Sequence, residues 1–201
     1  MQCGTDDRPS AGIGNKKMMN KLTAIKNMGF TTPWKLINIG LHGADEIPVA
    51  LTRDEVTDYL DGSLTEVNEQ TDDIISLLCE TDNETKFNAL LDQLANRDPS
   101  DPMIQKRKWR AYMLKTLIDN ISTDPLQAII ELMEFWVSMG IPDDCPQPFP
   151  DEGDKTAIQE YFTEASAEYL LNRNRLWLKE EIASIKNAEG KLSGSNQGII
   201  E

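Results

Sequence analysis

The chain has 201 residues, and its 20 Lys and Arg residues against 34 Asp and Glu residues give a formal net charge of −14. Such an acidic chain argues against nucleic-acid binding and against docking on anionic membranes, because both require a basic surface. One histidine and three cysteines exclude most zinc architectures. Length and composition therefore predict one acidic, globular domain.

The termini and the apolar runs of the sequence indicate the cellular compartment. No apolar run approaches the roughly 18 residues that a membrane span requires, and the N-terminal stretch lacks the apolar centre of a secretory signal. We expect a cytoplasmic protein with a disordered tail at 1–18 and a single all-helical domain at 19–186. The Gly, Ser and Asn residues near the end predict a flexible C-terminal tail at 187–201.

Caps and apolar spacing predict the helices of the first half. Thr32 as an N-cap and Pro33 at the first helical position predict a helix that runs to about Leu41 and stops at Gly43. Thr52 is predicted to cap a short acidic turn. Two further helices are indicated by apolar residues at helical spacing: Val67, Thr71, Ile74, Ile75 and Leu78, then Phe87, Leu90, Leu91 and Leu94.

Longer helices are predicted in the second half. One carries Ile104, Ala111, Leu114 and Ile118 on one stripe. The next opens at Asp124–Pro125 and is apolar on most sides, which predicts a central, buried helix. Prolines between 143 and 154 predict an extended loop. One long helix follows, with these expected buried positions: Ile158, Tyr161, Phe162, Ala165, Tyr169, Leu176, Trp177, Ile182 and Ile185.

No segment alternates between β-branched and polar residues, so no strand is predicted. Short amphipathic helices joined by short capped turns favour an array of antiparallel helical hairpins. The predicted fold class is therefore all-α, with a slight solenoid-like curve and no sheet.

The negative charge is concentrated in one part of the chain. Residues 45–102 contain 3 basic and 16 acidic side chains, a net charge of −13, whereas residues 1–44 carry +4 and residues 103–201 carry −5. This stretch is interpreted either as a solvated outer face or as a surface that steers a basic partner into contact. The one basic cluster, Lys106–Arg110, is predicted to pair with neighbouring acidic helices.

The residues that could carry chemistry form no catalytic or metal-binding motif. His42 is the only imidazole and lies near a predicted helix end, with no nucleophile motif to accompany it. Cys79 lies in an apolar stripe and is expected in the core, while Cys145 lies in the proline loop without a basic neighbour to activate it. The sequence predicts a non-enzymatic protein with no cofactor and no metal.

Several landmark segments carry a resemblance to a known family. They are residues 34–43, 53–56, 107–114, 124–126, 135–142 and 172–177, which contain Trp, Gly and Pro at recognisable places. Together they are similar to an uncharacterised family of small, acidic, all-helical bacterial proteins, over about residues 33–183. The basic N-terminal extension and the Gly/Ser-rich tail of this chain lie outside the resemblance.

The resemblance implies a role in protein binding. Such families resemble the immunity proteins encoded beside bacterial toxins, which neutralise a toxin domain by occluding its active site, and they offer no catalytic residue to transfer. The implied partner is a cognate toxin with a basic surface, not a nucleic acid or a membrane. Opposite potentials would speed the encounter with such a partner.

The candidate partner-binding residues come from the acidic stretch and from the proline loop. They are Asp58, Asp61, Glu66, Glu69, Asp72, Asp73, Asp143, Asp144, Phe149 and Asp151. Phe149 is interpreted either as an aromatic anchor for the partner or as a connector residue that packs onto the core. The alternative function is a helical scaffold or regulatory adaptor that holds a peptide in a groove between helices. An enzyme would need carboxylates gathered from several helices.

Overall fold

The computed structural model describes residues 19–64, 70–150 and 155–195. At 155–157 and 192–195 it describes the backbone alone. Within these ranges the chain forms helices and no strand. The helices are α1 (Lys21–Asn27), α2 (Trp34–His42), α3 (Arg53–Ser63), α4 (Thr71–Leu78), α5 (Glu84–Arg97), α6 (Pro102–Asn120), α7 (Pro125–Ser138), α8 (Lys155–Tyr161) and α9 (Glu164–Ser195). The prediction of an all-α fold is confirmed.

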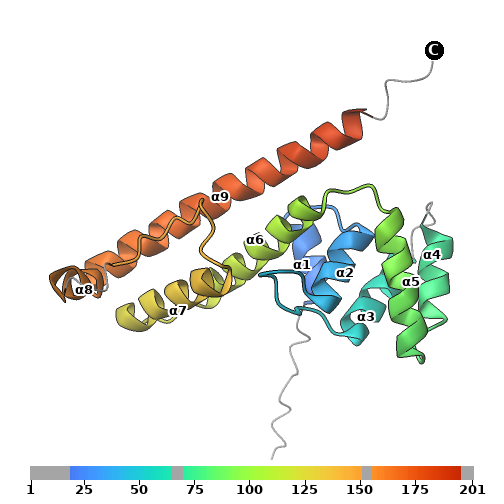
Figure 1. Ribbon diagram of the computed structural model, residues 1–201, viewed down its shortest axis with the longest axis horizontal. Helices are drawn as coiled ribbons and strands as arrows, with labels where there is room; N and C mark the ends of the chain where they lie inside the picture. Colours follow the sequence, from blue (N-terminus) through green and yellow to red (C-terminus); the bar gives the residue numbers. More distant parts are fainter. Residues whose placement is uncertain (1–18, 65–69, 151–154, 196–201) are drawn as a thin grey trace, which may run out of the picture.

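The helices form an elongated molecule with two different ends (Figure 1). Helices α1 to α5 gather at one end, α7 and α8 lie at the other, and α6 connects them. The 32-residue helix α9 packs against both α7 and α6. The most extensive packing joins α6 to α9, α2 to α6 and α7 to α9, and none of these pairs is adjacent in sequence. A solenoid of successive hairpins would instead contact mainly its sequence neighbours.

Two of the three predicted N-caps are correct, and one needs correction. Thr52 caps α3 by accepting from the backbone N–H of Glu55, whose carboxylate accepts from the backbone of Thr52 in return. Asp124 caps α7 by accepting from the N–H of Gln127, with Pro125 in the first turn. Thr32, however, is not the N-cap of α2: that position belongs to Pro33, which has no side chain to cap with.

Two tryptophans anchor the two ends of the core. The indole N–H of Trp109 donates to the carbonyl of Leu36 at 2.9 Å, and its ring lies against Gly40, where a Cβ would come within 2.3 Å of it. Gly40 therefore allows α2 and α6 to approach closely. Trp136 donates to Asn174 at 2.7 Å and meets Trp177 edge to face, so it joins α7 to α9.

The prediction for the helix at 125–138 is wrong in one respect. Its inner side chains Ile129, Leu132 and Trp136 are fully buried. The neighbouring face is open, because Leu126 and Val137 are 49% and 57% exposed. An apolar composition on most sides therefore does not make α7 a central helix; it lies at one end of the molecule (Figure 1).

Three further expectations need correction. The predicted long helix is two helices, α8 and α9, with the break at 162–163. Tyr169 and Leu176, expected to be buried, are 56% and 57% exposed. Residues 187–195 continue α9, and Glu189 contacts other helices, whereas a flexible tail was expected from residue 187.

The buried face of helix α4 also differs from the predicted one. Ile74 and Leu77 are its buried residues, and Ile75 points outward with 47% of its surface exposed. Cys79, at the C-terminal end of α4, is exposed and is not a core residue. The predicted stripe began at Val67, which lies outside the described residues. Helix α4 rests on α3 and α5 through Ile74 and Leu77, so Ile74 is the one predicted position in the described residues that is buried.

Candidate functional site

Helix α3 presents a row of carboxylates to solvent. Asp54, Asp58 and Asp61 are spaced i, i+4 and i+7, which places them on one helix face. The opposite face carries Val56 and Leu60, both buried. All three aspartates are exposed, and none makes an ion pair with any residue that the structure describes. We call these three residues the α3 acidic row.

The capping box holds the start of this row in place. Glu55 also forms an ion pair with Lys21 of α1 at 3.0 Å. Burial raises the pKa of the Glu55 carboxyl, but hydrogen bonds from Thr52 and Lys21 outweigh burial and leave that pKa below its ordinary value. At neutral pH Glu55 is an anion, and its ion pair with Lys21 links α3 to α1.

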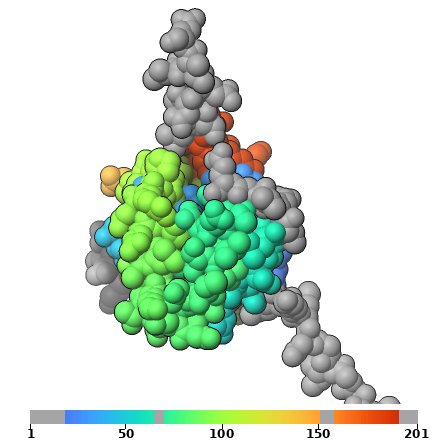
Figure 2. All heavy atoms as spheres, turned by 90° about the vertical axis from the view of Figure 1, so that its right-hand side faces the viewer, coloured from blue at the N-terminus to red at the C-terminus, as the bar shows by residue number. Residues whose placement is uncertain are grey.

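Acidic side chains on α4 and α5 extend the row, and Figure 2 looks directly at this end of the molecule. Asp72 at the start of α4 is exposed and makes no ion pair in the described part of the chain. Asp73 differs, because Arg97 of α5 binds it at 3.2 Å. The exposed Asp82 and Glu84 lie at the start of α5. The charge that the sequence concentrates in residues 45–102 is therefore largely available on the surface.

The other predicted contact residues lie elsewhere or outside the described ranges. Asp144, in the connector between α7 and α8, is bound by Arg110 of α6 at 3.1 Å. Asp143 is exposed, and Phe149 is half-buried against the core. Glu66, Glu69 and Asp151 fall outside the described residues. The structure brings Asp58, Asp61, Asp72 and Asp73 to one end and keeps the connector apart from them (Figure 1).

The basic cluster on α6 is used inside the protein. Arg107 binds both carboxylate oxygens of Glu181, at 2.8 and 2.6 Å, and Arg110 reaches the same carboxylate at 3.4 Å. The hydrogen bonds to Glu181 raise the pKa of Arg107 above its ordinary value. Lys106 pairs with Asp45. The cluster therefore pairs mainly with α9, not with the acidic helices α3 to α5.

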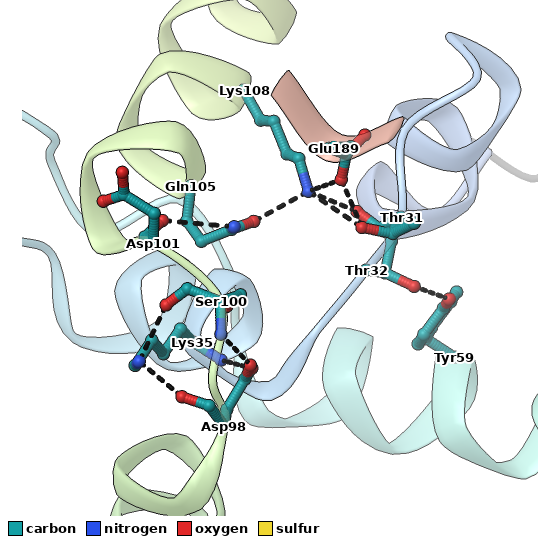
Figure 3. A network of polar contacts seen from close by, with 10 residues as sticks. All are labelled: Thr31, Thr32, Lys35, Tyr59, Asp98, Ser100, Asp101, Gln105, Lys108 and Glu189. Atoms are coloured by element: carbon teal, nitrogen blue, oxygen red, sulfur yellow. Dashed lines mark hydrogen bonds and ion pairs between the residues drawn. The ribbon is translucent and has the colours of Figure 1, made fainter. Parts of the chain in front are cut away.

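Lys108 lies at the centre of a buried polar network (Figure 3). Its ammonium donates to the carbonyl of Thr31 at 2.9 Å and to the side chain of Gln105 at 2.8 Å. Glu189 of α9 supplies a carboxylate at 2.5 Å. Burial lowers the pKa of Lys108, and Glu189 counteracts part of that effect. The network ties α9 to α6 and to the turn before α2.

A hollow of about 680 Å³ lies beside the α3 acidic row. Helices α1, α2, α3, α4 and α6 all contribute to its lining, which includes Trp34, Asp58, Tyr59 and Tyr112. The Tyr59 hydroxyl is already hydrogen-bonded to Thr32. The mixed lining of aromatic rings, hydroxyls and both signs of charge could accommodate a short segment of chain.

Groups that could perform catalysis are scattered over the described residues. His42 is exposed in the last turn of α2. Burial raises the pKa of the Cys145 thiol, which disfavours the reactive thiolate. Within the described ranges, no three His, Cys, Asp or Glu side chains are grouped closely enough to hold a metal ion.

Sequence reasoning missed Asp54 as part of the acidic row. The sequence prediction places Asp54 only in the short acidic turn that Thr52 caps, although its i, i+4, i+7 spacing with Asp58 and Asp61 is visible in the sequence. Carrying the helix beyond the first turn after Thr52 would have revealed the row.

The molecule is thus an all-helical protein with one markedly acidic end and with a basic cluster on α6 that is paired within the protein. Its chain belongs to the family described as "Uncharacterized protein conserved in bacteria (DUF2247)", whose family model matches residues 22–182. No curated protein and no solved structure matches the chain. In the described part of the chain, no helix combines the length and the apolar character needed to cross a bilayer.

Proposed function

We propose that this protein is a non-enzymatic cytoplasmic binding protein that neutralises a basic partner through its acidic end, in the way that an immunity protein neutralises a bacterial toxin. The observation that carries the proposal is the α3 acidic row, whose carboxylates are exposed and unpaired among the described residues. Unpaired carboxylates attract a basic surface without first breaking an internal ion pair. The partner is a protein domain with a basic cleft.

Rigid support for the row favours binding over simple solvation. Val56 and Leu60 are buried on the inner face of α3, and the capping box fixes its first turn. A preorganised row of charges loses little conformational entropy when a partner arrives. The same fixed charges accelerate the encounter at low salt.

Charge reversal on α3 tests the proposal. The protein is co-expressed with the product of the neighbouring gene, and association is followed at low and high salt. We expect Asp58→Lys with Asp61→Lys to lower the association rate constant by about tenfold at low salt, with a smaller effect at high salt.

The matched control makes the same change in net charge elsewhere. Glu168 and Glu180 are exposed on α9 and pair with no described residue, so Glu168→Lys with Glu180→Lys alters the net charge equally. Equal loss of association rate in both variants would contradict a role for α3 and indicate a general charge effect.

The hollow beside α3 supports the alternative, an adaptor that holds a peptide between helices. Its volume of about 680 Å³ and its aromatic lining suit a short extended segment. Tyr112→Ala distinguishes the two functions, because Tyr112 lines the hollow but lies on α6 outside the acidic row. Asp58 lines the hollow as well, so this comparison uses Asp54→Lys with Asp61→Lys, two residues outside the lining. A partner that Tyr112→Ala weakens and that this charge reversal does not would support the adaptor.

A further inference from the structure

The outer face of α7 carries an exposed apolar stripe. Leu126, Ile130 and Val137 are 49%, 38% and 57% exposed, and Met133 is half-buried between them. These positions share one side of the helix, next to the face that carries its buried residues, while Gln127, Glu134 and Ser138 lie on the side opposite the core. A continuous row of exposed apolar side chains on a helix surface indicates an interaction surface.

The residue that follows the end of α7 has an unfavourable backbone conformation. Gly140 and Ile141 both have positive φ angles, 73° and 46°, and the N–H of Ile141 donates to the carbonyl of Trp136 at 2.9 Å. A β-branched residue rarely adopts such a φ. In this type of helix ending the residue after glycine usually packs back onto the helix, but Ile141 is 48% exposed. Ile141 is therefore a further exposed apolar side chain just after the end of α7.

The charges around the stripe indicate which kind of partner can bind there. Between Lys115 and Lys155 the sequence contains no Lys, Arg or His. Glu134 lies next to the stripe on α7 and is exposed, and Glu131 lies further round the same helix. A second copy of this chain would place carboxylates against carboxylates, which is unfavourable. A helix with an apolar face and basic flanks would satisfy both the stripe and the carboxylates.

We propose that the outer face of α7 is a docking surface for a basic amphipathic helix of another protein. The stripe from Leu126 to Val137 spans about 17 Å, the length of three turns of such a helix. This surface lies at the opposite end of the molecule from α3 (Figure 1). It is therefore independent of the proposed function, and either can fail without the other.

A labelled peptide tests the surface on the full chain. The probe is a helical peptide of about 18 residues made of Leu, Ala and Lys, with one apolar face and lysines beside it. One control peptide has the same composition in scrambled order, and another has Glu in place of Lys. We expect the probe to bind more tightly than both controls, as measured by fluorescence anisotropy.

Matched serine variants locate the binding. Leu126→Ser, Ile130→Ser and Val137→Ser together should weaken the probe by about tenfold or more. The control variant combines Val49→Ser, Ile75→Ser and Met103→Ser, which are exposed apolar side chains outside α7, and should leave affinity unchanged. Equal weakening in both variants, or equal binding of the scrambled peptide, would overturn the proposal.

Glu134→Lys keeps the test decisive if the serine variant fails to fold. It leaves the stripe intact and reverses the charge beside it, so it should weaken the Lys peptide and strengthen the Glu peptide. Unchanged preference between the two peptides would overturn the basic occupant. Concentration-dependent dimers of the unmodified protein in sedimentation experiments, abolished by Val137→Ser, would assign the stripe to a second copy instead.

Discussion

The two sides of the molecule use charge in different ways. Where α6 meets α9, Glu181 is 6% exposed and is held by two arginines, and Lys108 is enclosed with Glu189. On α3, Asp58 and Asp61 face solvent and pair with no residue in the described ranges. The difference follows from packing, because α6 is covered by other helices along most of its length and α3 is covered on one face.

This contrast separates charges that hold the fold from charges that are free to act on a partner. Removing the buried Glu181 carboxylate leaves Arg107 without its ion-pair partner and leaves Arg110 with Asp144 alone. An exposed carboxylate without a partner contributes little to folding. Side chains of the second kind are available to binding, and α3 collects them in one row.

Removing Glu181 should produce the largest loss of stability. Glu181→Ala leaves the guanidinium groups of Arg107 and Arg110 without their shared carboxylate, and we expect a loss of about 3 kcal/mol in the free energy of unfolding. Urea denaturation followed by circular dichroism measures it. The control is Glu180→Ala, an exposed neighbour on α9, which should change stability by less than about 0.5 kcal/mol. Similar losses for both variants would remove the distinction between the two kinds of charge.

Replacing Glu189 should have a smaller effect that depends on pH. Glu189→Gln keeps an acceptor near Lys108 but removes the charge that raises its pKa, and we expect a cost of about 1–2 kcal/mol at pH 7. Because the folded-state pKa of Lys108 is below its ordinary value, the unfolded chain binds more protons. Stability from this group therefore rises as pH increases toward the ordinary lysine pKa.

Comparing the unmodified protein with Glu189→Gln across pH isolates the contribution of Lys108 to stability. In Glu189→Gln the folded-state pKa of Lys108 falls further, so the variant should recover part of its deficit as pH rises. Urea denaturation of both proteins between neutral and alkaline pH measures the difference in their free energies of unfolding. The other lysines titrate equally in both proteins, so their contributions cancel in this difference. A deficit that stays constant with pH would show that Lys108 does not depend on Glu189 for its charge.

Local signals in the sequence predicted much of the fold. Caps such as Thr52 and Asp124 act through bonds within a few residues, so they could be recognised without the tertiary structure. The prediction of Thr32 as an N-cap was wrong because its hydroxyl forms a hydrogen bond with Tyr59 of α3, a partner that is distant in sequence. The prediction that α7 is a central helix was wrong because composition does not show which of its apolar faces is covered by other helices.

The candidate site was partly predictable for the same reason. The acidic character of residues 45–102 is a property of the sequence, and the surface position of Asp58, Asp61 and Asp72 agrees with it. The pairing of Asp73 with Arg97 and of Asp144 with Arg110 depends on helix packing. Packing therefore decides which members of a charged stretch remain available.

Neutralising the acidic row should have the smallest effect on stability, and its sign is informative. Asp61 lies in the last turn of α3 and close to Asp58, so Asp58→Asn with Asp61→Asn removes repulsion between like charges and an unfavourable interaction with the helix dipole. We expect a gain of up to about 0.5 kcal/mol in urea denaturation. Asp54→Asn, in the first turn, should instead lose about that amount. A clear loss in the double variant would mean that the row supports the fold, and its carboxylates would no longer be free for a partner.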